Sequence, residues 1–167
     1  MNSPFDPAAF IPFANLINGK DDFFRILEEI EGTKRFLFRD KMGPISLKAG
    51  EYLSPDLSRV FGQIEQLGLE PTTDDKQQDF LNDIMEFLKT IPVVKIIFAF
   101  EPTASFVAGV NSKLSNAVGK KIILDYAVDE DIVGGVKIEY LGKFGDFSLE
   151  PAVETFLKGK IQELNIS

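Results

Sequence analysis

The chain has 167 residues, enough for one ordinary domain or two small ones. It contains no His and no Cys, which excludes Ser-His-Asp and Cys-His catalysis, disulfides and thiolate metal sites. Its hydrophobic fraction of 44% and charged fraction of 26% are typical of a globular protein, and its net charge of −8 disfavours binding to nucleic acid or directly to anionic lipid.

Residues 1–90 are expected to form a helical bundle. Asp6-Pro7 and Ser54-Pro55 each pair a capping residue with a proline suited to the first helical position. The first expected helix lies within residues 6–18 and either starts or kinks at Pro12. The others are a stretch that begins at Asp21 or Asp22, residues 54–68, and a stretch that begins at Asp74 or Asp75. Residues 32–53 contain a Gly-Pro break and fit either a short helix or an irregular segment.

Residues 91–167 are expected to alternate between strands and helices. The predicted order is a strand over 94–100, a helix from Pro102 to Gly119, a strand over 120–128 and a strand over 136–140. A turn at 143–145, a short strand and a last helix from about Leu149 complete the pattern. We therefore predict an α+β fold of two domains, a helical N-terminal domain (1–90) and a C-terminal domain (91–167). The second domain would be a two-layer unit of two helices on a mixed sheet of three to four strands.

Two polar motifs could suggest ligands. The acidic run of Asp125, Asp129, Glu130 and Asp131 lacks the spacing of a calcium loop, and a capped turn between strands is the simpler interpretation. Gly134-Gly135 precedes a strand, whereas a phosphate loop precedes a helix, so a strand start that needs positive φ or close backbone approach is favoured. We expect no metal and no cofactor.

Five phenylalanines are candidates for partner binding. Phe98, Phe100 and Phe106 lie near the end of one predicted strand and the start of the next helix, while Phe144 and Phe147 lie on the predicted hairpin. Most should pack in the core. A small two-layer domain leaves one sheet face uncovered, however, and an apolar uncovered face often binds a partner.

Residues 128–149 carry a family resemblance. An aspartate-led turn (128–132), Gly134-Gly135, a strand, a glycine turn, Asp146-x-Ser148 and a terminal helix follow one another in this order. With the strand and Glu-Pro turn at 94–103, this order resembles the C-terminal domain of the delta subunit of F-type ATP synthases, the oligomycin-sensitivity-conferring protein family. Gly134, Gly135, Asp146 and Ser148 are the structural residues of that motif. The resemblance covers about residues 92–164.

The resemblance implies a non-catalytic stator subunit of a bacterial-type, proton-translocating ATP synthase. In that family the C-terminal domain holds the b subunit of the peripheral stalk, and the N-terminal bundle grips the N-termini of the alpha subunits. The protein would lie at the cytoplasmic face of the bacterial membrane, which it would contact only through the complex. The N-terminal half lacks the family's Arg-Tyr-Ala-x-Ala-Leu type motif.

Two alternatives to this interpretation remain open. A free-standing acidic adaptor could share only the C-terminal fold. A hydrolase could use Asp125 with Asp129 or Asp146, although the absence of His leaves only carboxylate chemistry.

We expect no transmembrane segment, no secretion signal and no mitochondrial transit peptide, because the longest apolar run is 96–100 and the start is poor in Arg.

Overall fold

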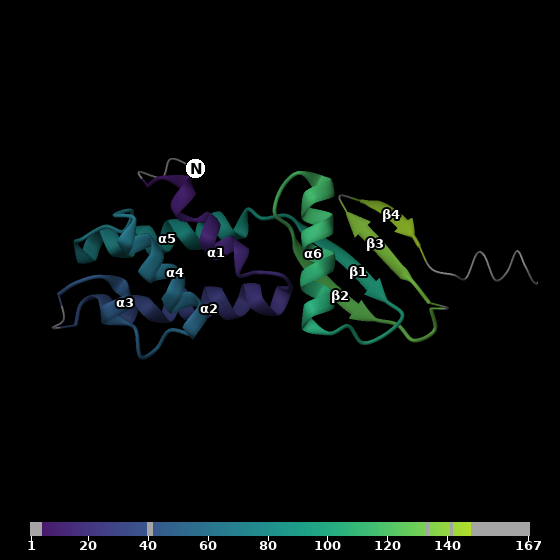
Figure 1. The fold of residues 1–167 in the computed structure, drawn as a ribbon, viewed down its shortest axis with the longest axis horizontal. Coiled ribbons are helices and arrows are strands. Elements are labelled where there is room, and N and C mark those ends of the chain that lie inside the picture. Colours follow the sequence, from purple (N-terminus) through teal and green to yellow (C-terminus); the bar gives the residue numbers. More distant parts are fainter. Residues whose placement is uncertain (1–4, 40–41, 133, 141, 148–167) are drawn as a thin grey trace, which may run out of the picture.

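The computed structural model describes residues 5–39, 42–132, 134–140 and 142–147. Helices gather at one end of the molecule and a four-stranded sheet at the other (Figure 1). The helical elements are η1 (Pro7–Ala9), α1 (Ile11–Asn15), α2 (Lys20–Leu37), α3 (Ile45–Lys48), α4 (Pro55–Gln66), α5 (Asp74–Lys89) and α6 (Ala104–Val118). The strands are β1 (Val93–Phe98), β2 (Ile123–Val128), β3 (Val136–Tyr140) and β4 (Lys143–Asp146). The α+β fold class with N-terminal helices is therefore confirmed.

The helices η1 to α5 enclose one core because each long helix has an apolar stripe at helical spacing. Phenylalanine rings fill much of this core, as in the edge-to-face pair of Phe13 and Phe61, whose ring centroids are 5.0 Å apart. Complete burial of a large apolar side chain stabilises the fold by about 1.5–3 kcal/mol. In the part of the chain that the structure describes, no helix is long and apolar enough to span a membrane.

The sheet has the strand order β2-β1-β3-β4. β1 and β2 are parallel and are joined through α6, whereas β3 is antiparallel to both β1 and β4. Because side chains alternate along a strand, Val94, Ile96 and Phe98 of β1 are buried on the side of α6. Lys95 and Ile97 point to the opposite face. The last predicted helix lies outside the described residues.

Two details of the prediction were wrong or incomplete. The chain reverses between Tyr140 and Lys143, where Gly142 has a φ of 74°, and residues 143–145 belong to β4 rather than to a turn. α2 continues through Gly32 to Leu37, into the stretch that the sequence left open. A Cβ atom on Gly32 would lie 2.0 Å from the Tyr52 hydroxyl, so the missing side chain makes room for the Tyr52 ring against α2.

Candidate functional site: exposed aromatic surfaces and the junction behind them

An aromatic cluster stands at the end of β1 and the start of α6. Phe98 is completely buried, with its ring centroid 5.7 Å from that of Phe106 and 6.0 Å from that of Phe100. Phe100 and Phe106 are 46% and 42% exposed, and their centroids lie 5.3 Å apart. The expectation that Phe98 contacts a partner does not fit the structure, because Phe98 supports the rings of Phe100 and Phe106 from within the core.

Phe144 and Phe147 lie on opposite faces of the sheet. Phe144 pairs across from Glu139 on the face turned away from α6. Phe147 lies over Gly145 on the side of α6, where a Cβ atom on Gly145 would be 2.7 Å from its ring. Both side chains are 65% exposed. The five candidate phenylalanines therefore form no single surface.

The sheet face turned away from α6 combines paired charges with apolar side chains. Asp125, Lys95 and Glu139 lie side by side on β2, β1 and β3, and Lys95 Nζ is 3.7 Å from Glu139 Oε2. A hollow of about 230 Å³ on this face is lined by these three charged residues together with Lys137, Ile97 and Phe144. Exposed ion pairs of this kind stabilise a fold by at most about 1 kcal/mol, so Ile97 and Phe144 are the more favourable part of this hollow for a partner.

The family-motif glycines form the turn before β3. Gly134 and Gly135 have φ values of 67° and 86°, which other residues rarely adopt. The carbonyl of Gly135 accepts a hydrogen bond from the amide of Ala99, at 3.3 Å, so this turn approaches the end of β1. The Asp129 carboxylate accepts from the amide of Asp131, at 3.0 Å, and so caps the preceding turn. Asp146 lies in β4 opposite Lys137, and Ser148 lies outside the described residues.

The carboxylates of the hydrolase alternative do not converge. Asp125 on β2 and Asp146 on β4 are separated by three strand spacings, about 14 Å. Asp129 follows the end of β2, four residues beyond Asp125, which corresponds to about 13 Å along the chain. Among the residues with described positions, no group of three or more acidic side chains could hold a metal ion. The geometry gives no support to paired carboxylate chemistry.

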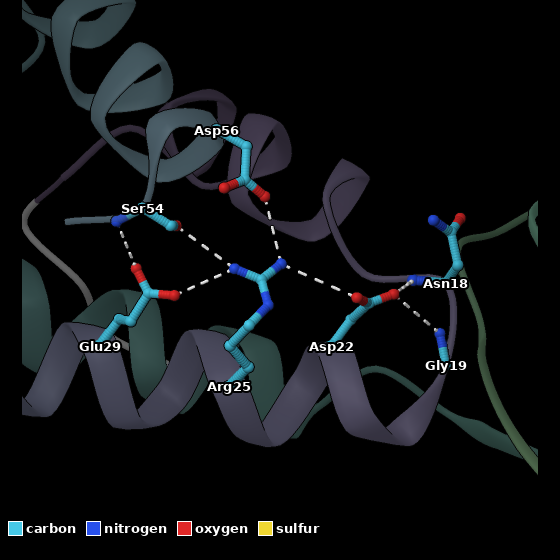
Figure 2. Close-up of polar contacts among 7 residues, drawn as sticks. All are labelled: Asn18, Gly19, Asp22, Arg25, Glu29, Ser54 and Asp56. Atoms are coloured by element: carbon cyan, nitrogen blue, oxygen red, sulfur yellow. Dashed lines mark hydrogen bonds and ion pairs between the residues drawn. The ribbon is translucent and has the colours of Figure 1, made fainter. Parts of the chain in front are cut away.

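An arginine-centred network connects α2 to the start of α4 (Figure 2). The Arg25 guanidinium donates to Glu29 at 3.0 Å, to Asp56 at 3.1 Å and to the Ser54 hydroxyl at 3.3 Å. Burial alone would raise the pKa of Asp56, but the Ser54 hydroxyl and the Arg25 charge together lower it below its usual value. Arg25 also lies 3.7 Å from Asp22. Sequence reasoning identified Ser54 only as a cap.

Asn111 joins the two halves of the molecule. This side chain is 1% exposed, and its Nδ2 donates to the carbonyl oxygens of Asn18 at 2.8 Å and Ile122 at 2.9 Å. Its Oδ1 accepts from Lys121 Nζ at 3.0 Å. The Asn18 carbonyl also accepts from the amide of Leu124, at 3.1 Å, so the chain before α2 pairs with β2. A polar residue at a stripe position of α6 was the sequence signal that could have indicated this contact.

Asp22 connects this junction to the arginine network. Its carboxylate accepts from the amides of Asn18, at 3.0 Å, and Gly19, at 3.4 Å (Figure 2). Lys20 Nζ adds an ion pair of 3.1 Å to Asp125 on β2. A continuous series of polar contacts therefore runs from the sheet through residues 18–29 to α4.

A comparison with known families shows which family the chain belongs to. The family model described as ATP synthase delta (OSCP) subunit matches residues 74–158, more than half of the chain. The chain belongs to the ATP synthase delta (OSCP) subunit family. This family provides a structural subunit of the peripheral stalk of F-type ATP synthase, and the resemblance carried by residues 128–149 is confirmed.

Other comparisons add little to the delta (OSCP) assignment. No curated protein matches the chain. A chain in the cryo-EM structure of the Polytomella F-ATP synthase in primary rotary state 3 is similar at 22% identity and a TM-score of 0.36. The alignment covers 46% of this chain and 98% of that chain. The likeness is too weak to compare the two folds.

Proposed function

We propose that this chain is the stator adaptor of a bacterial-type, proton-translocating ATP synthase. It links the catalytic head to the peripheral stalk, resists the torque of rotation and catalyses no reaction itself. The observation that carries this proposal is the family match over α5 and the sheet. The absence of His and Cys and the separation of Asp125, Asp129 and Asp146 agree with a non-catalytic role.

The proposed partner of the sheet half is the C-terminal end of the b subunit of the stalk. Phe100 and Phe106 offer an exposed aromatic pair, held in place by the buried ring of Phe98. Anchored aromatic side chains of this kind supply much of the binding energy at protein interfaces. Phe144 and Phe147 are secondary candidates on the two faces of the sheet.

The helical half is the proposed contact for the N-termini of the alpha subunits. We also propose that residues 1–90 and 91–167 are two domains, since the described helices before β1 share one core and α6 packs on a second core with the sheet. In the assembled enzyme the protein would lie at the cytoplasmic face of the bacterial membrane, held there through its partners.

Binding to a soluble C-terminal segment of the b subunit from the same organism tests this function. We expect the full chain to bind, and Phe100→Asp and Phe106→Asp to weaken binding at least about tenfold, because each places a charge in an apolar contact. Titration calorimetry measures the Kd of the b segment for the wild-type chain and for each variant. The matched control is Leu67→Asp, which changes an exposed apolar residue of the helical half.

The opposite result has a clear meaning. If the full chain is folded by circular dichroism but does not bind the b segment, the stator role is wrong. The chain would then be a free-standing adaptor that shares only the fold of the family.

A further inference from the structure

A basic segment interrupts this acidic chain. Residues 34–48 contain five Lys or Arg and one Asp, a formal charge of +4 in a chain whose total is −8. The Lys48 ammonium is buried and paired with Asp74, and Lys34 pairs with Glu31. Arg35 and Arg39 are exposed, and neither has an ion-pair partner among the described residues.

Exposed apolar side chains lie in and just after the same stretch of chain. Met42 is 94% exposed, Phe38 and Leu47 are each 58% exposed, and Tyr52 is 41% exposed. They belong to the end of α2, to α3 and to the loops beside α3, at the end of the helical half furthest from the sheet (Figure 1). We call the surface formed by Arg35, Phe36, Phe38, Arg39, Met42, Leu47 and Tyr52 the basic tip.

The basic tip contains a recess. A hollow of about 540 Å³ is lined by residues that include Phe36, Arg39, Leu47 and Tyr52, and by one exposed carboxylate, Glu51, which is next to Tyr52 in the sequence. The rings of Phe36 and Tyr52 lie 5.2 Å apart, and the Arg39 guanidinium carbon is 4.3 Å from the centroid of the Phe36 ring. This stacking orders the guanidinium, whose edge has no carboxylate partner among the described residues and is suited to bind one in bidentate geometry.

We propose that the basic tip docks an acidic amphipathic helix of a partner protein. Apolar side chains at helical spacing would enter the hollow beside Leu47 and Tyr52, and a flanking Asp or Glu would pair with Arg39. Aromatic residues, Met and Arg are the types enriched at the centres of protein interfaces. The basic tip lies on the helical half, for which the N-termini of the alpha subunits are the proposed contact. The docking depends neither on that contact nor on the proposed contact of the sheet half with the stalk.

A membrane surface fits these observations less well than a helix does. A basic residue near an anionic leaflet contributes about 1 kcal/mol, and Arg35 and Arg39 are the exposed cations of this tip within the described residues. The net charge of −8 would oppose their attraction to lipid. A concave hollow also receives protruding side chains better than it receives a flat lipid surface.

The test uses the full chain and a panel of synthetic helical peptides of about 18 residues. The peptides share one stripe of Leu and differ in flanking residues, which are Glu, Lys or Ser. We expect the Glu peptide to bind with a Kd of about 10–100 µM by fluorescence anisotropy, and the Lys and Ser peptides to bind at least about tenfold more weakly. Arg39→Glu and Leu47→Ser should each weaken the Glu peptide about tenfold or more.

The control is Arg59→Glu, which makes the same change of charge at an exposed arginine of α4, outside the hollow. It should leave the Glu peptide bound. Equal losses for Arg39→Glu and Arg59→Glu, or no peptide binding by the folded chain, would overturn the proposal. A different occupant of the tip would also overturn it. In that case no Glu peptide binds, and Arg39→Glu abolishes either binding to phosphatidylserine vesicles or self-association measured by sedimentation.

Discussion

Glu70 has a carboxyl group in an unusual environment. Its Oε1 accepts hydrogen bonds from the amide of Ile45, at 2.6 Å, and from Gln77 Nε2, at 3.2 Å. Its Oε2 is buried and has no hydrogen-bond partner among the residues that the structure describes. Burial raises the pKa of Glu70 to about 7, and the neighbouring Glu65 adds to the rise, while the Ile45 amide and Lys48 oppose it.

The raised pKa of Glu70 predicts that stability depends on pH. Because the folded state holds this proton more tightly than the unfolded chain, the stabilisation is complete below about pH 4.5 and is lost as the pH rises through 7. Glu70→Gln keeps the acceptor Oε1 and cannot ionise. We expect urea unfolding at pH 8 to show the variant about 1–2 kcal/mol more stable than wild type, after allowance for solvent screening, with little difference at pH 5.

Glu28→Gln is the matched control, since it removes the charge of an exposed carboxylate on α2. It should leave the difference in unfolding free energy between pH 5 and pH 8 unchanged. If Glu70→Gln and Glu28→Gln give the same pH profile, the Glu70 carboxyl is not the source of the dependence.

At the scale of single elements, Tyr52 packs against α2 in the space left by the missing side chain of Gly32. Glycine in a helix normally costs about 1 kcal/mol relative to alanine. Here a Cβ atom would collide with the Tyr52 ring, whose nearest carbon would be 2.4 Å away. The side chain of Tyr52 also contacts Phe36 on the next turn of α2.

The effect of Gly32→Ala should therefore change sign with residue 52. In the wild-type background we expect Gly32→Ala to lower the free energy of unfolding, because Tyr52 must leave its position against α2. In a Tyr52→Ala background the same substitution should raise it by about 0.5–1 kcal/mol, the ordinary gain in helix propensity. Urea unfolding of the four proteins of this cycle measures both effects, and an equal effect in both backgrounds would rule out the collision.

The elements differ in how far the sequence determines them. Local signals suffice for α4 and α5, because Ser54-Pro55 and Asp74 mark helix starts and the apolar stripe follows at once. The extent of α2 could not be predicted, since a glycine at residue 32 lowers helix propensity and the packing of the Tyr52 ring against it is not visible in the sequence. That information lies in a tertiary contact.

The candidate surfaces were predicted only in part, for a similar reason. Phe98, Phe100 and Phe106 were correctly grouped, because they are close in sequence. Their burial depends on the register of β1 against α6, which a single sequence does not give, so Phe98 could not be separated from its exposed neighbours. The basic tip was missed, although the charge of residues 34–48 is visible in the sequence.

At the scale of the whole molecule, the junction at Asn111 should hold the helices and the sheet in a fixed relation. Asn111→Asp is nearly isosteric, but its carboxylate would face the carbonyl oxygens of Asn18 and Ile122, to which Nδ2 now donates. We expect a loss of about 2–4 kcal/mol in urea unfolding, since the oxygen that replaces Nδ2 would face two carbonyl oxygens with no donor, while Lys121 still donates to the other oxygen.

Hydrogen exchange distinguishes a local from a general effect of Asn111→Asp. The amide of Leu124, which donates to Asn18, should lose protection more than amides within α4 do. The control Asn116→Asp changes an exposed asparagine of the same helix and should alter neither measurement. Unchanged protection of Leu124 in Asn111→Asp would show that the junction does not depend on this side chain.

The pairing of residues 18–19 with β2 has a consequence for any attempt to study the sheet in isolation. β2 is an edge strand, and the segment before α2 occupies its outer side at Leu124. Ile123 of the same strand is 1% exposed and belongs to the helical core. A fragment without the helices would present an unpaired strand edge together with an uncovered isoleucine, the combination that promotes aggregation between chains. The N-terminal half thus also protects the sheet from pairing with other molecules.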